Sequence, residues 1–360
     1  MTGALALADR GHDVTLLEAG EIPHPLAEST DVSKAVRMDY GADEFYASHM
    51  ERALERWRAW NAELGETLFH ESGAMFVTRE PMAPGGFEHE SFALLGRRGH
   101  RLERLDATDI ARRSSLRGFV DGYFNPEGGW AESGRVVERL AARARDRGVA
   151  VRPNARAAHV EPGAVVLASG ERALGDAVVL ACGGWVPALL PEIAASFRTV
   201  GQPVFHLEAG ADVALPVFGA DLSRTGWYGF PRQDTFVKVA NHGAGRAMAP
   251  DSSLRETTVV EEERLREFLR ASLPSLASAP LRKTRVCVYC DTLDEHFWIA
   301  PHPDAPTLVV ATGGSGHAFK FAPLVGDWIA RALEGDVVPR FRWRPELARA
   351  AHGDAARRRQ

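Results

Sequence analysis

Apolar residues recur at helical spacing in several parts of the chain. Residues 47–64 carry them with charged residues between, which predicts an amphipathic helix. Residues 133–148 predict a second helix, which begins at a Ser cap and ends at Gly148. A third helix is expected near residues 260–273. Residues 29–46 mix polar, basic and aromatic residues without a period, so they predict a loop of the kind that often carries functional residues.

Runs of β-branched and apolar residues bounded by turn residues predict strands. The stretch "TLFHESGAMFVT" predicts two short strands broken at Gly73. Further on, "DAVVLACGG" predicts a buried strand that runs into glycines. Residues 200–285 predict an antiparallel sheet with a helical cover. The basic tail at 356–360 predicts a frayed terminus.

The alternation of these patterns predicts an α/β fold in which one domain is threaded through another. An α/β pattern gives way to a β-rich one twice along the chain, which fits a Rossmann-like dinucleotide-binding domain interleaved with an antiparallel β-sheet plus helix substrate domain. The first domain is expected to comprise residues 1–75, 130–200 and 285–360, and the second residues 76–129 and 201–284.

The first residues resemble the second half of a dinucleotide-binding βαβ unit. Residues 2–8 predict a helix, Gly11 its stop, and "DVTLLE" a strand that ends at Glu18. In such a unit, an acid at the end of the second strand holds the ribose hydroxyls, and a G-x-G-x-x-G loop lies about 20 residues earlier. That loop would fall at or before Met1, so we expect a start assigned too late or a truncated chain.

Composition and charge narrow the classes of partner. The chain has 360 residues, a formal charge of −5 and a pI near 6.2, so no nucleic-acid partner is expected. No apolar run is long enough to span a membrane, and the first residues do not resemble a secretory signal. Because the chain has only three cysteines, we expect no disulfide scaffold, and we expect a cytoplasmic location.

The stretch "VVATGGSGHAFKF" combines a strand, a glycine loop and a helix start. Gly313, Gly314 and Gly316 would place backbone N–H groups around an anion or a ring edge. The alternative is a tight turn that uses glycine for backbone reasons alone. Lys320 lies between two phenylalanines and is expected to be partly enclosed.

A C-x-x-C pair at Cys287 and Cys290 raises the question of a metal or redox site. A structural zinc site needs four ligands and no second pair exists, so no metal is expected. In a strand, Cys287 and Tyr289 share one face and Cys290 points to the other. Cys290 and Cys182 are interpreted as core cysteines.

Lys238 and His242 lie four residues apart around a turn, so both can face one cavity. On their own they are equally compatible with a solvent-facing pair.

Six stretches together carry a resemblance over nearly the whole chain. "RGHDVTLLEAG", "STDVSKAVRMDYG", "YGFP", "KVANHG", "CVYCDTLDEHFWI" and "ATGGSGHAFKF" stand in the order and at the separations found in FAD-dependent amine oxidases. The chain is similar to the group of monomeric sarcosine oxidase, pipecolate oxidase and fructosyl amino acid oxidase. That family also begins with the strand and glycine loop that this chain lacks.

The resemblance implies roles for individual residues. Cys287 matches a cysteine that carries FAD through a thioether, and Lys238 matches a lysine near the flavin that assists the reaction with O2. Lys320 and Arg37 match basic residues near the substrate carboxylate or the flavin. The substrate-pocket positions are Tyr228, Tyr289 and His242, and the remaining positions expected to contact FAD are Glu18, Lys34, Gly183, Trp185, Gly313, Gly314, Gly316 and His317.

At two positions the chain differs from sarcosine oxidases in a way that concerns the substrate. Lys34 stands where sarcosine oxidases carry an arginine, and Asn241 where they carry a tyrosine, so the chain is more like the fructosyl amino acid oxidases.

The resemblance therefore implies a monomeric FAD-dependent oxidase. Its substrates would be a small secondary amine and O2, and its products an imine and H2O2. Two alternatives stay open, a flavin dehydrogenase with another electron acceptor and a flavin-free remnant that acts as a binding protein.

Overall fold

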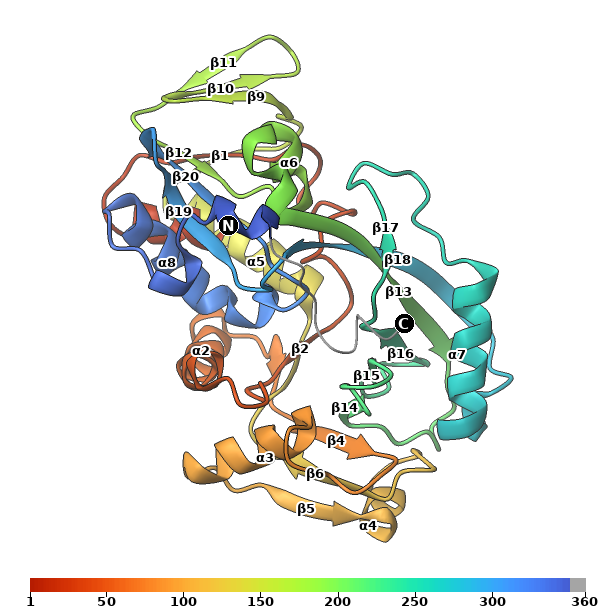
Figure 1. The fold of residues 1–360 in the computed structure, drawn as a ribbon. Helices are drawn as coiled ribbons and strands as arrows, with labels where there is room; N and C mark the ends of the chain where they lie inside the picture. The colour runs from red at the N-terminus through yellow and green to blue at the C-terminus, as the bar shows by residue number, and fades with distance from the viewer. Residues whose placement is uncertain (350–360) are drawn as a thin grey trace.

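The computed structural model describes residues 1–349, and the tail predicted at 356–360 lies outside the described residues. Two parallel strand pairs form its first part. β1 (Thr15–Leu17) pairs with β8 (Ala150–Arg152), and β12 (Val178–Leu180) pairs with β20 (Ala305–Thr312). β19 (Trp298–His302) extends the second pair in the antiparallel sense. Figure 1 shows these strands next to the helices of this part, which are α1 (Thr2–Ala8), α2 (Glu44–Leu64), α5 (Ser133–Asp146), α6 (Val186–Leu189) and α8 (Ala322–Leu333).

These helices form because their apolar residues share one face. α2 buries Met50, Leu54 and Trp57, which pack with Trp328 of α8 in one hydrophobic core. α1 lies directly against α8, since a Cβ on Gly326 would stand 2.3 Å from the backbone oxygen of Thr2. Glycine at that position is therefore what lets the two helices approach.

A nine-stranded sheet forms the second part. Its order is β17-β13-β16-β15-β14-β4-β6-β5, with β18 paired to β13. All of its pairs are antiparallel except β14 with β4. α7 (Val259–Ser272) covers one face, as predicted. The strands are β4 (Ala74–Thr78), β5 (Glu103–Asp106), β6 (Asp121–Asn125), β13 (Phe197–Glu208), β14 (Val217–Ala220), β15 (Trp227–Gly229), β16 (Phe236–Asn241), β17 (Arg246–Ala247) and β18 (Leu281–Thr292), and two further helices are α3 (Phe87–Arg97) and α4 (Ala107–Arg113).

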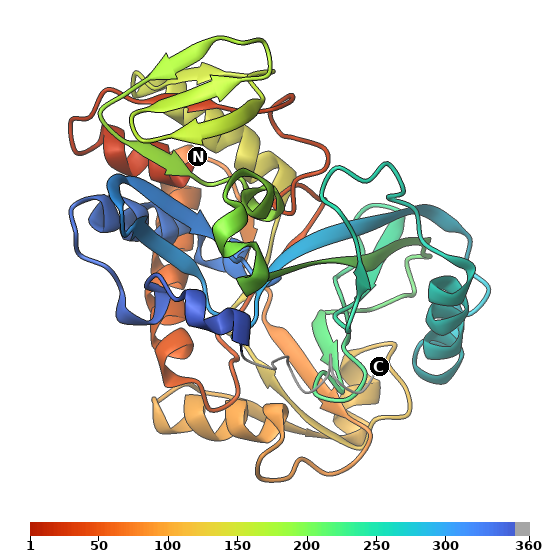
Figure 2. The same ribbon diagram turned by 45° about the horizontal axis from the view of Figure 1, so that its top comes forward.

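The long strands β13 and β18 connect the two parts. They pair over most of their length and run from the parallel strands to α7 (Figure 2). Alternation along them divides their side chains, since Phe205 and Leu207 pack toward α7 while Val204, Cys287 and Tyr289 lie on the opposite face. Residues 200 and 285 fall within these strands, and the domain boundaries drawn there stay a prediction.

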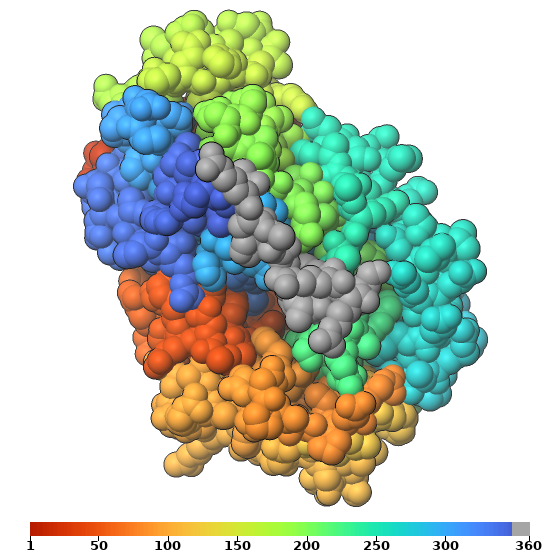
Figure 3. Space-filling view, viewed as in Figure 1, coloured from red at the N-terminus to blue at the C-terminus, as the bar shows by residue number. Residues whose placement is uncertain are grey.

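Smaller elements complete the fold. The strands β9 (Ala157–Glu161), β10 (Ala164–Leu167) and β11 (Arg172–Leu174) form a separate antiparallel sheet, which makes a lobe at the top of Figure 3. Another small sheet has the order β2-β7-β3. Its strands are β2 (Lys34–Val36), β7 (Gly129–Ala131) and β3 (Phe69–His70), and the 3₁₀ turns are η1 (Gly183–Trp185), η2 (Pro191–Ser196), η3 (Pro274–Leu276), η4 (Ala318–Phe321), η5 (Pro339–Phe341) and η6 (Pro345–Arg349).

The fold class predicted from the sequence is confirmed, with three local corrections. Residues 34–36 form β2 inside the predicted loop, because they pair with β7 far along the chain. Ser133 does not cap α5, since its hydroxyl donates to the backbone oxygen of Asp31 instead. Cys182 is exposed and is not a core residue, because it follows the last buried residue of β12. Within residues 1–349, no helix has the length and apolar character needed to cross a membrane.

Candidate functional site

A cavity of about 2350 Å³ runs along β1 and β12 and on to the inner face of the nine-stranded sheet. Most of the predicted site residues line it. They are Glu18, Lys34, Arg37, Gly183, Trp185, Tyr228, His242, Tyr289, Gly314, Gly316, His317 and Lys320. The other three, Lys238, Cys287 and Gly313, are not part of this lining, and the catalytic candidate Lys238 and the cofactor-binding candidate Cys287 are fully buried.

The strands β13, β16 and β18 place the buried candidates on one face of the sheet. Lys238 stands opposite His206 in the pairing of β16 with β13, and Cys287 stands opposite Gln202 in the pairing of β18 with β13. Directly opposed residues of an antiparallel pair share a face. The predicted division of the C-x-x-C pair is confirmed, because Cys290 points away and its sulfur lies 3.5 Å from the hydroxyl of Thr312.

Lys238 is held by a carboxylate and a backbone oxygen. Its Nζ lies 2.5 Å from Oδ2 of Asp31 and 2.5 Å from the backbone oxygen of Ser33. Burial lowers the pKa of Lys238 to about 8, although the charge of Asp31 opposes that change. The pKa of Asp31 is well below its usual value, because its burial is outweighed by Lys238 and other nearby donors and cations.

Lys34 provides a second cation next to Cys287. Its Nζ lies 3.8 Å from the Cys287 sulfur, which in turn lies 4.0 Å from the backbone oxygen of Glu28. Burial alone would lower the pKa of Lys34, but the sulfur of Cys287 and the carboxylate of Asp31 raise it above the ordinary value. A charged lysine therefore lies beside the thiol that the sequence singled out.

Two tyrosines and a histidine form the wall next to these cations. Tyr228 and Tyr289 share a hydrogen bond, and burial raises the pKa of both hydroxyls. The ring of His242 lies 5.9 Å from that of Tyr289. Gly316 allows this packing, because its φ is +70° and a Cβ there would stand 2.3 Å from the Tyr289 ring.

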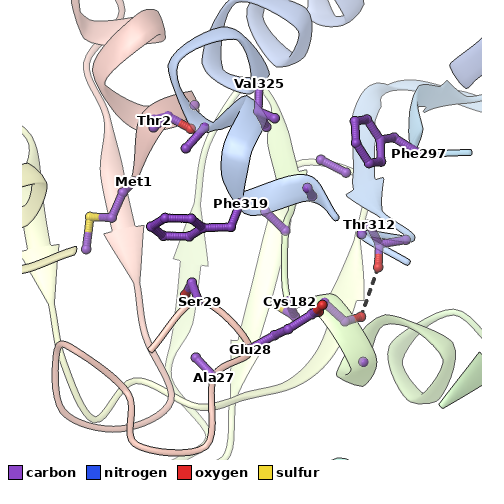
Figure 4. A pocket seen from close by; sticks show the side chains of 18 of the residues that line it. Met1, Thr2, Ala27, Glu28, Ser29, Cys182, Phe297, Thr312, Phe319 and Val325 are labelled. Carbon is purple, nitrogen blue, oxygen red and sulfur yellow. Dashed lines mark hydrogen bonds between the residues drawn. The ribbon is translucent and has the colours of Figure 1, made fainter. Parts of the chain in front are cut away.

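The glycine loop after β20 also meets the segment that follows β12. The Thr312 hydroxyl donates to the backbone oxygen of Gly183 over 2.9 Å, and Figure 4 shows this bond beside Cys182 at the cavity wall. Gly313 has a φ of +68°, and its Cβ would stand 2.4 Å from the side chain of Thr292. Gly313 and Gly316 therefore have packing reasons to be glycine, and a Cβ on Gly314, which also lines the cavity, would stand 3.3 Å from the Cβ of Ala318.

His317 and Trp185 have partners within the protein. His317 contacts the Tyr40 hydroxyl through Nδ1 at 2.9 Å and the backbone oxygen of Glu295 through Nε2 at 3.0 Å. The Trp185 ring nitrogen donates to the carboxylate of Asp251. Both side chains are thereby fixed in orientation at the cavity wall.

Arg37 and Lys320 both lie close to the ring of Tyr40. The Arg37 guanidinium lies 5.6 Å and the Lys320 Nζ 5.1 Å from the centre of that ring, and Lys320 donates to the Tyr40 hydroxyl over 3.2 Å. Burial, with the charge of Arg37 second, lowers the pKa of Lys320 well below its usual value. The carboxylate of Asp39 acts on Lys320 in the opposite direction; it accepts a hydrogen bond from Tyr123, and burial raises its own pKa.

An apolar wall adjoins Arg37. The guanidinium lies 5.5 Å from the ring centres of both Phe76 and Phe87. Beyond them the cavity is lined by Val217, Leu222 and Phe230, which pack in the same hydrophobic cluster as Phe76. The site therefore combines two basic side chains with an apolar surface directly beside Arg37.

Glu18 lies at the end of β1, as predicted, and its carboxylate accepts a hydrogen bond from the backbone N–H of Gly20 over 3.2 Å. The glycine loop expected upstream would lie before Met1, and that expectation stays a prediction.

Sequence reasoning missed Asp31 and Tyr40. Both stand inside the stretch "STDVSKAVRMDYG", so the motif held the signal, but only the fold shows which of its residues meet the lysines.

Comparisons with known proteins agree with this arrangement. The family model described as FAD dependent oxidoreductase matches residues 1–332. Among curated proteins, the chain is 26% identical over 352 residues to monomeric sarcosine oxidase of a Bacillus species, covering 93% of this chain and 90% of that protein. It is 27% identical over 348 residues to N-methyl-L-tryptophan oxidase of Salmonella arizonae, covering 92% and 90%.

Solved structures show the same fold. Fructosyl amine:oxygen oxidoreductase (Amadoriase I) from Aspergillus fumigatus superposes with a TM-score of 0.80 at 23% identity, covering 96% of this chain and 87% of that one. NikD, an unusual amino acid oxidase essential for nikkomycin biosynthesis, superposes with a TM-score of 0.82 at 23% identity, covering 98% and 94%.

Proposed function

The chain belongs to the family of FAD-dependent oxidoreductases, and from that premise we propose that it oxidises the secondary amine of an N-substituted amino acid with O2. Bound FAD supplies the two-electron acceptor that connects the amine to O2. One hydrogen leaves the carbon next to the nitrogen and one leaves the nitrogen. O2 receives both with two electrons, so the products are an imine and H2O2, and water then hydrolyses the imine.

The residues present fit FAD. The cavity is more than twice the roughly 300–1,000 Å³ of ordinary small-molecule sites, so it has room for a dinucleotide and a substrate. Glu18 at the end of β1 offers a carboxylate to ribose hydroxyls, and Gly314 lines the same cavity. Lys34 lines the cavity and Lys238 and Cys287 are buried next to it, where the three residues would adjoin the flavin ring.

The basic pair Arg37 and Lys320 carries the proposal for the substrate. Both line the cavity near the ring of Tyr40, and a substrate carboxylate that reached both would pair with each. Because burial keeps the pKa of Lys320 low, the arriving carboxylate would raise it and the lysine would take up a proton. The pair thus fixes one end of an amino acid.

The apolar wall next to Arg37 supports an apolar group on that amino acid. Phe87, Leu222 and Phe230 offer contact area, whereas the hydroxyls of a sugar-derived substituent would lose their water partners there. We therefore place N-alkyl amino acids with an apolar side chain ahead of fructosyl amino acids.

Lys238 and Cys287 have proposed roles toward the cofactor. A fixed ammonium group at Lys238 would stabilise the negative charge that O2 acquires on reduction. The Lys34 ammonium lies 3.8 Å from the Cys287 sulfur, the atom through which FAD would be attached. A monomer is proposed because a matching relative is named monomeric sarcosine oxidase. A cytoplasmic location stays a prediction.

A substrate panel tests the proposal. The purified holoenzyme is supplied under air with sarcosine, N-methyl-L-leucine, N-methyl-L-tryptophan, pipecolate and fructosyl valine, and both H2O2 and O2 uptake are measured. We expect equimolar H2O2, fastest with the apolar N-methyl amino acids. Flavin reduction without H2O2 would instead indicate a dehydrogenase, and no reduction by any secondary amine would refute the proposal. The variant Arg37→Leu should raise KM for every substrate.

A further inference from the structure

We propose that Asp31 and His206 are positioning residues for Lys238, which hold its ammonium group in place and in the charged form. This inference rests on the proposed function, in which that ammonium faces the reaction with O2. The two residues come from the predicted loop and from β13, and neither was singled out by the sequence.

The contacts of Lys238 fix its side chain from two directions. Its Nζ donates to Oδ2 of Asp31 and to the backbone oxygen of Ser33, each over 2.5 Å. The ring centre of Phe230 lies 4.6 Å from the same nitrogen. Lys238 is 1% exposed, so water does not compete for these contacts. An ammonium group has three N–H donors, and Asp31 and Ser33 take two of them.

His206 faces the other carboxylate oxygen. It stands opposite Lys238 in the strand pairing, and its Nε2 lies 3.7 Å from Oδ1 of Asp31. The ring is 4% exposed, and neither of its nitrogens has a hydrogen-bond partner among the described residues. A buried imidazole without a hydrogen-bond partner destabilises the fold unless a nearby polar group interacts with it. Asp31 is the polar group within reach, so the histidine is placed to limit where the carboxylate can turn.

The carboxylate of Asp31 stabilises the charged form of Lys238. The charged or titratable groups that act on Lys238 are Asp31, Lys34 of β2 and Cys287 of β18. Asp31 in turn is acted on by Lys34, His206 and Arg285, and it also acts on Tyr228 of β15. Burial and Lys34 both disfavour its charged form, and Asp31 is the carboxylate that opposes them. A lysine loses its charge in such surroundings, whereas an arginine would keep it. The charge on Lys238 is therefore set by Asp31.

The composition of the chain makes a direct test possible. Lys34, Lys238, Lys283 and Lys320 are its only lysines. Lysine labelled with ¹³C at Cε therefore gives four NMR signals, each of which reports the protonation of one ammonium group and is assigned by single Lys→Arg variants. The measurement uses the flavin-loaded protein but needs no amine substrate.

We expect the Lys238 signal to titrate near pH 8 in the unsubstituted protein. Asp31→Asn should lower that midpoint by at least about one pH unit, and His206→Gln by a smaller amount. Asp39→Asn is the matched control, because that buried carboxylate raises the pKa of Lys320 and should move only the Lys320 signal. An unchanged Lys238 midpoint in both Asp31→Asn and His206→Gln overturns the inference. If Asp31→Asn does not fold, the result for His206→Gln decides.

A kinetic readout links the titration to the reaction. The chemically reduced protein is mixed with O2, which avoids any dependence on the amine. At pH 8, Asp31→Asn should reduce the charged fraction of Lys238 from about one half to below about one tenth, and so slow reoxidation about fivefold or more. In Lys238→Met, adding Asp31→Asn should cause no further loss; an additional loss of similar size would show that Asp31 acts independently of the lysine. If no amine reduces the flavin while these results hold, the proposed function fails and the positioning role stands.

Discussion

Binding of a substrate carboxylate should draw a proton onto Lys320. In the free protein, burial and Arg37 hold the pKa of Lys320 well below the usual value. A carboxylate about 4 Å from the ammonium contributes roughly 4 kcal/mol of attraction at an effective dielectric constant of 20, before desolvation is subtracted. Because that attraction exists only for the charged lysine, ligand binding raises the pKa of Lys320.

The affinity for a carboxylate ligand should depend on pH, because the pKa of Lys320 is lower in the free protein than in the complex. Below the pKa of the free form, Lys320 is already charged and affinity is highest. As pH rises from that value toward the pKa of the complex, each binding event must recruit a proton and affinity falls. The net value of a charge-assisted hydrogen bond is about 1.5–3 kcal/mol, so Lys320→Met should weaken binding about 10- to 100-fold at low pH and abolish the pH dependence.

Calorimetry measures both quantities. A non-reactive carboxylate with an apolar group, such as phenylacetate, is titrated into the holoenzyme in buffers of different ionisation enthalpy. The dependence of the heat on the buffer gives the number of protons taken up, which should approach one for the unsubstituted protein and zero for Lys320→Met. Zero uptake at every pH from 6 to 10, together with unchanged affinity in Lys320→Met, would refute the reasoning.

Four further outcomes follow from the contacts described. Lys238→Met should slow reoxidation of the reduced protein by about 10²-fold while leaving flavin reduction nearly unchanged, which stopped-flow absorbance resolves. Cys287→Ser should release flavin into the supernatant after acid precipitation, where the unsubstituted protein retains it in the pellet. Gly316→Ala should cost about 1–3 kcal/mol of unfolding free energy, because of a positive φ and the Tyr289 ring, whereas Gly335→Ala, with open space around its Cβ, should show only the smaller backbone cost. His100 is half-buried between Glu51 and Glu127, whose hydrogen bonds and charges outweigh desolvation and raise its pKa, so its stabilisation is complete below about pH 6.5 and is lost as pH rises through the raised value; His100→Gln should therefore lower the free energy of unfolding more at pH 6 than at pH 9, by about 1 kcal/mol.

Local periodicity made several features predictable. The helices at 47–64 and 260–273 were identified from their apolar faces, and the structure places α2 and α7 there. The alternation of β18 separated Cys287 and Tyr289 from Cys290 without any knowledge of the fold. α2 begins at Glu44, earlier than predicted, because Asp43 caps it through the Tyr46 N–H.

Pairing between distant segments could not be predicted from the sequence. β2 has three residues and no local signal, since its partner β7 lies far along the chain. The apolar wall combines Phe76, Phe87, Leu222 and Phe230, which come from separate segments and share no motif. Such surfaces form only after strands from different regions have been brought together.

By itself the sequence determined the fold class, the family resemblance and a set of site residues most of which line the cavity, because strand alternation, glycine loops and helical periods are encoded between near neighbours. Only the tertiary structure decided which of those residues act on one another. It brought Asp31 against Lys238, 207 positions away, set His206 behind both, and placed Arg37 and Lys320 around Tyr40. The charge of each buried group depends on desolvation and on these distant partners, and neither exists until the chain has folded.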